Sequence, residues 1–133
     1  MRSVVAVVAG LIAIVATHLG ADELMRVLSV FPPSNEPIYD QRLTFLAFSY
    51  RSVFSVLGCY LTARLAPRAP MTHALILGGI GTALSIAGLV ATAGMNLGPR
   101  WYPIALVLSA LPCAWLGGLL LAAQRQTQLR AAR

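Results

Sequence analysis

The sequence predicts an all-α integral membrane protein, a bundle of four transmembrane helices with the N- and C-termini both in the cytoplasm. Hydrophobic residues occupy 58% of the 133 positions, and charged residues only 11%. A water-soluble fold this small cannot bury so much apolar surface. Four apolar stretches are long enough to cross a hydrocarbon core about 30 Å thick, and most of the arginines gather on one side of them.

The four spans are predicted at about residues 4–30, 43–65, 72–95 and 101–123, within a single domain that covers residues 1–133. Backbone polar groups in lipid must be satisfied within each segment or within a closed barrel. The stretches lack the alternation of barrel strands, so each is expected to be a helix. Residues 124–133 are expected to form a basic cytoplasmic tail that extends the last helix.

Proline and glycine mark the connections between the spans. The proline-rich segment 31–37 cannot continue a helix and predicts an outer loop. The prolines of residues 66–70 predict a tight turn, and residues 96–99 end the third span. Trp101 and Tyr102 then begin the fourth span as an aromatic anchor at the membrane interface.

The orientation follows from the distribution of arginine, because cytoplasmic loops carry an excess of positive charge. One side of the spans holds two arginines together with Glu36 and Asp40. The other side holds no acid and six arginines: Arg2, Arg64, Arg68, Arg125, Arg130 and Arg133. This second side is expected in the cytoplasm, as in a multipass protein of a bacterial inner (plasma) membrane. The net charge of +6 is thus interpreted as a topology signal, with the lipid bilayer and not nucleic acid as the partner.

The first span carries ionisable residues in its second half. His18, Asp22 and Arg26 recur every four residues and share one helix face, and Glu23 lies beside them. At about 1.5 Å per residue, Asp22 lies roughly 27 Å from the start of its span and Arg51 roughly 21 Å from the end of the second span. These two levels are close enough for an arginine side chain to reach an acid of the first span.

An unpaired charge within hydrocarbon is costly, so Arg51 requires an acidic partner. We predict that either Asp22 or Glu23 pairs with Arg51, while the other acid meets Arg26 or faces a water-filled cavity. Ser55, one turn after Arg51, belongs to a polar stripe on the second span. The predicted polar intramembrane cluster therefore comprises His18, Asp22, Glu23, Arg26, Arg51 and Ser55.

Two interpretations of this cluster remain open. In one it fastens two helices together. In the other it forms a proton or ion pathway, because acids and a histidine at membrane depth can titrate once they are desolvated. A metal site would need a third ligand beside His18 and Asp22, so neither a metal nor another cofactor is expected.

Small residues on the third span predict a surface for close helix packing. They recur every three or four residues and comprise Gly78, Gly81, Ser85 and Gly88. The partner helix belongs either to the same chain or to a second copy. In the fourth span, Pro112 frees a carbonyl one turn earlier and predicts a kink.

The length, the four spans and an acid in the first span resemble the small multidrug resistance transporters, in which such an acid binds a proton and a cationic drug in a dimer. Asp22 and Glu23 lie late in the first span, however. The aromatic binding residues of the middle spans are missing, and the arginine bias argues against dual topology. The resemblance therefore ends at the architecture.

Enzyme activity is not expected, because the sequence contains no Ser/His/Asp set, no HExxH motif and no phosphate-binding glycine loop. Two functions remain. The chain is a proton- or ion-coupled transporter or channel-like homo-oligomer, or it is a non-catalytic accessory or assembly subunit of a larger membrane complex.

Overall fold

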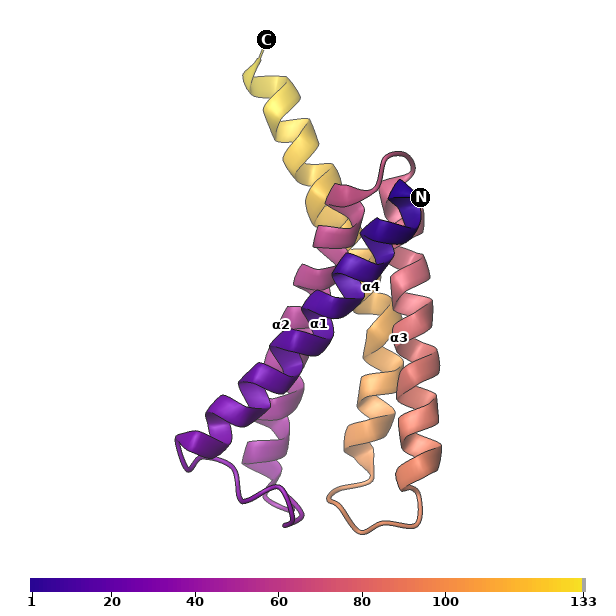
Figure 1. Ribbon diagram of the computed structural model, residues 1–133. Helices are drawn as coiled ribbons and strands as arrows, with labels where there is room; N and C mark the ends of the chain where they lie inside the picture. The colour runs from indigo at the N-terminus through magenta and orange to yellow at the C-terminus, as the bar shows by residue number, and fades with distance from the viewer. Residues whose placement is uncertain (133) are drawn as a thin grey trace.

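A computed structural model of the chain describes residues 1–132, which form four α-helices and no strand (Figure 1). The helices are α1 (Arg2–Val27), α2 (Gln41–Leu65), α3 (Pro70–Thr92) and α4 (Trp101–Ala131). Each is long and apolar enough to cross a membrane, and α2 is the least apolar. The predicted all-helical class with membrane-length helices is thus confirmed.

The ends of α1 and α2 differ from the predicted bounds for local reasons. α1 stops at Val27, because Ser29 adopts a left-handed backbone with φ 57°. The amides of Val30 and Phe31 then turn back to the Met25 carbonyl, at 2.9 and 3.1 Å. α2 starts at Gln41, because the Asp40 carboxylate caps the helix by accepting a hydrogen bond from the Arg42 amide at 2.8 Å.

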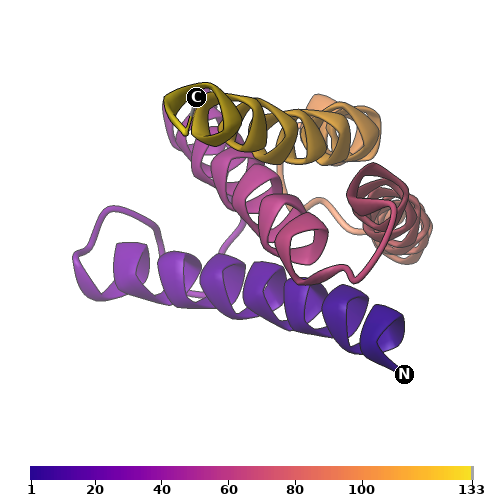
Figure 2. The same ribbon diagram turned by 90° about the horizontal axis from the view of Figure 1, so that it is seen from above.

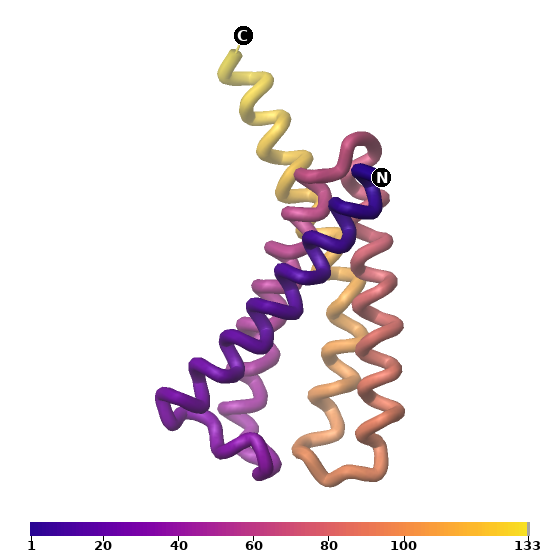
Figure 3. The backbone as a smooth tube through the Cα atoms, in the orientation of Figure 1, coloured from indigo at the N-terminus to yellow at the C-terminus, as the bar shows by residue number. Residues whose placement is uncertain are grey.

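The last two helices begin at or near the predicted residues and end differently: α3 ends early, and α4 continues through the tail as expected. α3 begins with Pro70, which suits the first turn of a helix, and ends at Thr92 instead of 95. α4 runs without a break through Pro112 and through the predicted tail to Ala131. The last turns of α4 project beyond the other helices (Figure 3).

The molecule has two ends. We call the end with Met1, the α2–α3 turn and the last turns of α4 the termini end, and the end with segments 28–40 and 93–100 the loop end (Figure 1). Seen from above, α2 lies between α1 and α4, and α3 lies beside α4 (Figure 2). Within the described residues α1 packs against α2, and to a smaller extent α3, but not against α4. Toward the loop end, α1 and α2 lean away from α3 and α4 (Figure 1).

The core lies nearer the termini end and consists mainly of small side chains: Cys59, Ala63, Ala74, Leu77, Ala114 and Leu121. Glycines bring the backbones together there. A Cβ atom on Gly10 of α1 would lie 2.9 Å from the Gly58 carbonyl of α2. One on Gly117 of α4 would lie 2.6 Å from the Val56 carbonyl and 2.7 Å from the Tyr60 amide. These crossings fix α2 against both of its neighbours.

The predicted small-residue surface of α3 meets α4 over part of its length. Gly78 is buried directly against Ala114 of α4, and a Cβ atom on Gly81 would lie 4.0 Å from that of Ala110. Ser85 is half-buried, and a Cβ atom on Gly88 would meet no described atom within 4 Å.

Gly117→Ala should lower the thermal unfolding midpoint of the purified protein in detergent. The new methyl group would press on the α2 backbone, which cannot rotate away, and overpacking of this kind costs about 1–3 kcal/mol. Gly79→Ala is the matched control, since its methyl group meets nothing within 4 Å and alanine favours a helix. Equal midpoints for the two variants would contradict the crossing.

Candidate functional site

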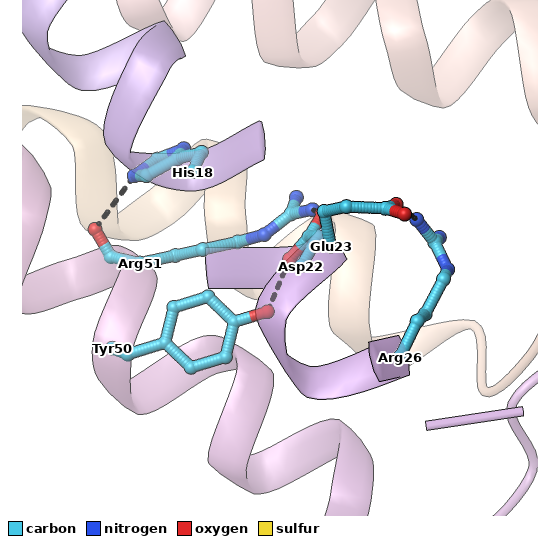
Figure 4. Close-up of polar contacts among 6 residues, drawn as sticks. All are labelled: His18, Asp22, Glu23, Arg26, Tyr50 and Arg51. Carbon is cyan, nitrogen blue, oxygen red and sulfur yellow. Dashed lines mark hydrogen bonds and ion pairs between the residues drawn. The ribbon is translucent and has the colours of Figure 1, made fainter. Parts of the chain in front are cut away.

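The centre of the polar cluster is the carboxylate of Asp22 on α1. Its Oδ1 accepts a hydrogen bond from the Tyr50 hydroxyl, and its Oδ2 accepts one from the Arg51 guanidinium (Figure 4). The Arg51 side chain is 25% exposed and that of Asp22 is 13% exposed. Arg51 therefore pairs with Asp22 and not with Glu23.

The antiparallel course of α1 and α2 explains why these residues meet. Asp22 lies close to the end of α1, and Arg51 lies in the loop-end half of α2, so both stand at a similar height. Tyr50 and Arg51 are neighbours in the chain and point about 100° apart on the helix. Both side chains are long enough to converge on one carboxylate, and each engages a different oxygen.

His18 adds a second contact between the two helices. It lies one turn before Asp22, and its Nε2 is 3.0 Å from the backbone carbonyl oxygen of Arg51 (Figure 4). A carbonyl only accepts hydrogen bonds, so this geometry requires the hydrogen to be on Nε2. The His18 ring also lies 6.4 Å from the Phe54 ring. His18 thus holds the α2 backbone at the residue whose side chain binds Asp22.

Arg51 also reaches the fourth helix. Its guanidinium carbon lies 5.9 Å from the centre of the Tyr102 ring on α4, within the range of a cation–π contact. Arg51 thereby links α1 and α4, which do not pack against each other within the described residues. Among the described residues, the buried Nε of Arg51 has no hydrogen-bond partner.

The other predicted members lie at the edge of this arrangement. Glu23 forms an ion pair with Arg26 on the same helix at 3.5 Å (Figure 4), and its side chain is 70% exposed. Exposed pairs of this spacing contribute little to stability. Ser55 is half-buried and, among the described residues, makes no side-chain hydrogen bond to the cluster.

Several contacts join the segments of the loop end next to the cluster. The Phe31 side chain is 6% exposed, and its ring lies 6.4 Å from that of Tyr50. The indole Nε1 of Trp101 donates to the Gln41 side-chain oxygen at 3.0 Å. The two outer segments also meet directly, because the Ile38 amide donates to the Leu97 carbonyl at 3.1 Å. Phe31 thus packs beside Tyr50 of the cluster, and the two outer segments are joined to each other.

Sequence reasoning did not assign Tyr50 and Tyr102 to the site. Tyr50 lies on another face of α2 than Arg51, and Tyr102 fits an interfacial anchor equally well. The available signal was a tyrosine directly before the arginine of the second predicted span, at the height of an acid. Within residues 1–132, no three His, Cys, Asp or Glu side chains come together in a way that would hold a metal ion.

Comparisons of the chain with protein-family models, curated proteins and solved structures find no match. The chemistry of the site therefore has to be argued from its own geometry. A carboxylate shared between a phenol and a guanidinium is stable while it is ionised. Neutralising it removes the ion pair and leaves the guanidinium charged, because arginine does not lose its proton in proteins.

Asp22→Asn should destabilise the protein by about 1.5–3 kcal/mol, the range for hydrogen bonds to charged groups. Unfolding by added SDS in mixed micelles measures the change. Glu23→Gln is the control and should cost about 0–1 kcal/mol, since its pair is exposed.

A double-mutant cycle separates this pair from general damage. Asp22→Asn combined with Arg51→Gln should show a coupling energy of about 0.5–3 kcal/mol, as expected for residues in contact. Glu23→Gln combined with Arg51→Gln should be additive. Additivity in the Asp22 cycle would contradict the pairing.

Proposed function

We propose that the chain is a four-span integral protein of a bacterial inner membrane with its termini end in the cytoplasm. Large apolar side chains are exposed around the helices, for example Val4 at 65%, Ile12 at 62%, Val90 at 70% and Leu108 at 70%. Apolar exposure on this scale suits lipid and not water. The arginine-rich termini end supports the orientation through the positive-inside rule.

Cysteine labelling tests this placement. Ser34→Cys at the loop end and Ala132→Cys at the termini end form a matched pair in a Cys59→Ala, Cys113→Ala background. In intact spheroplasts a membrane-impermeant maleimide should label only Ser34→Cys, and permeabilisation should expose Ala132→Cys. Labelling of Ala132→Cys in intact cells would contradict the orientation.

We further infer that the Asp22–Arg51 cluster is the coupling site of a proton- or ion-driven transport unit. One observation carries this proposal: the Arg51 side chain joins α1 to α4 where the two helix pairs diverge (Figure 1). Ionisable residues at membrane depth are costly, and they commonly mark ion or substrate pathways.

The proposed coupling follows from the contacts. A proton or another cation on Asp22 cancels the charge that attracts Arg51. The Arg51 guanidinium then retains its cation–π contact with the Tyr102 ring, and its Nε donor still has no partner among the described residues. α1 loses its ion pair and keeps the crossing at Gly10 together with the neutral contacts of His18 and Tyr50. Occupancy of Asp22 therefore changes how the loop-end half of α1 is attached.

One chain of this size encloses little volume, so the transport unit requires further copies or other membrane subunits. A second candidate function is that of an accessory or assembly subunit. The observation in its favour is that both oxygens of Asp22 are already engaged. A carboxylate satisfied in this way fits a permanent fastening of α1 to α2.

A flux assay distinguishes the two functions. The purified protein is reconstituted into liposomes that contain a pH-sensitive dye, and a potassium gradient with valinomycin drives protons inward. The wild-type protein and Glu23→Gln should acidify the lumen. Asp22→Asn should fall to the level of protein-free liposomes, because an amide neither binds the proton nor pairs with Arg51.

The opposite result is equally informative. Absence of wild-type flux, with foreign subunits copurifying in stoichiometric amounts, would reject the transport proposal and support the accessory function. Flux that is unchanged in Asp22→Asn would remove Asp22 from the pathway.

A further inference from the structure

A second feature lies at the termini end, remote from the Asp22 cluster. The start of α3 and the cytoplasm-directed part of α4 in the proposed orientation enclose a cavity of about 250 Å³. Its lining residues are Pro70, Met71, Gly118, Leu121, Ala122 and Arg125. All of them except Arg125 are apolar, so the cavity has an apolar wall and one cationic side chain.

Gly118 brings α3 close to α4 on one side of the cavity. A Cβ atom there would lie 2.9 Å from the Cε atom of Met71, so the Met71 side chain lies directly against the α4 backbone. Leu121 is 4% exposed and forms a packed part of the wall, while Ala122 and Arg125 are exposed. One side of the cavity is therefore closely packed, and the other side is open at the surface of the molecule.

The charge around this cavity is of one sign. Within residues 1–132, the charged side chains of the termini end are all arginines: Arg2, Arg64, Arg68, Arg125 and Arg130. The four acids of the chain lie in the other half, at positions 22, 23, 36 and 40. Among the described residues, Arg125 accordingly makes no ion pair, and the complementary ligand is an anion.

We propose that this cavity binds one anionic phospholipid, with its phosphate on Arg125 and the upper part of an acyl chain against Met71, Leu121 and Ala122. Basic pockets between membrane helices on the cytoplasmic side recognise anionic headgroups, and arginine binds phosphate through paired hydrogen bonds. The proposal rests on the membrane placement proposed above. It does not depend on transport or on Asp22.

The apolar wall selects a lipid over free phosphate. An inorganic phosphate ion would meet one guanidinium and otherwise apolar carbon, which does not replace its water of hydration. A phospholipid instead removes the apolar lining from water and keeps its charged group at the mouth. Arg125 belongs to the last turns of α4. These turns project beyond the other helices (Figure 3), which suits the level of headgroups.

Native mass spectrometry of the full chain tests the proposal. The protein is released from micelles containing equal amounts of phosphatidylglycerol and phosphatidylcholine with identical acyl chains. The wild-type protein should retain one phosphatidylglycerol molecule in preference to phosphatidylcholine. Arg125→Gln should reduce that preference about tenfold, the factor expected for the loss of a hydrogen bond to a charged group. Arg130→Gln removes the same charge outside the cavity and should behave as wild type.

A second pair of variants tests the apolar wall without changing charge. Ala122→Phe fills the cavity from an exposed position and should also abolish retention, whereas Ala123→Phe, an exposed neighbour outside the lining, should not. Equal losses for Arg125→Gln and Arg130→Gln would overturn the site in favour of a diffuse basic surface. Displacement of the lipid by millimolar phosphate would overturn it in favour of a free-anion site.

The result is separable from the other proposals. Loss of lipid selectivity with correct cysteine labelling would reject this site alone. Lipid selectivity that persists in the absence of proton flux would leave the site standing and reject only transport.

Discussion

The contact between Asp22 and Arg51 determines how the first helix is attached to the rest of the molecule. α1 crosses α2 closely at Gly10 and Gly58, near the termini end, and does not pack against α4 within the described residues. Its other half is held by the ion pair, the Tyr50 hydroxyl and His18. A guanidinium within hydrocarbon needs such a partner, so the position of α1 and the location of charge on α2 depend on each other.

The molecule accordingly has two halves that are stabilised in different ways. Near the termini end, glycine and alanine allow backbones to pack within van der Waals distance, where dispersion between close helices stabilises them. Near the loop end the helices diverge and long side chains bridge them, such as Arg51 to Tyr102 and Trp101 to Gln41. Packing of the first kind does not respond to protons or ions. The second kind contains the ion pair of Asp22 and Arg51, so a response to ions, if the proposed function holds, belongs to the loop-end half.

The sequence predicts the helices and the height of the cluster well, because length, apolarity and residue rise are local properties. It does not predict which acid meets Arg51. Asp22 and Glu23 differ by about 100° around the helix, and the rotation of α1 is set by the distant crossing at Gly10. Tyr50 was not assigned to the cluster because it lies on another face of α2 than Arg51.

Gly88 follows the small-residue pattern, yet it meets no neighbour because α3 is packed closely only farther toward the termini end. The end of α1 depends on the left-handed Ser29, for which serine gives no strong signal.

The height of the cluster bears on whether it can open. At the centre of a bilayer, separating a carboxylate from its guanidinium would strand two charges in hydrocarbon, and the pair would be permanent. Asp22 instead lies in the last turns of α1, and both side chains keep some exposure, 13% and 25%. In the proposed membrane placement, water or a headgroup can stabilise either partner there, so separating the pair costs less free energy than at the centre. In the proposed placement this height suits either role: a permanent fastening costs less near the interface, and the same exposure gives a proton or another cation access to Asp22.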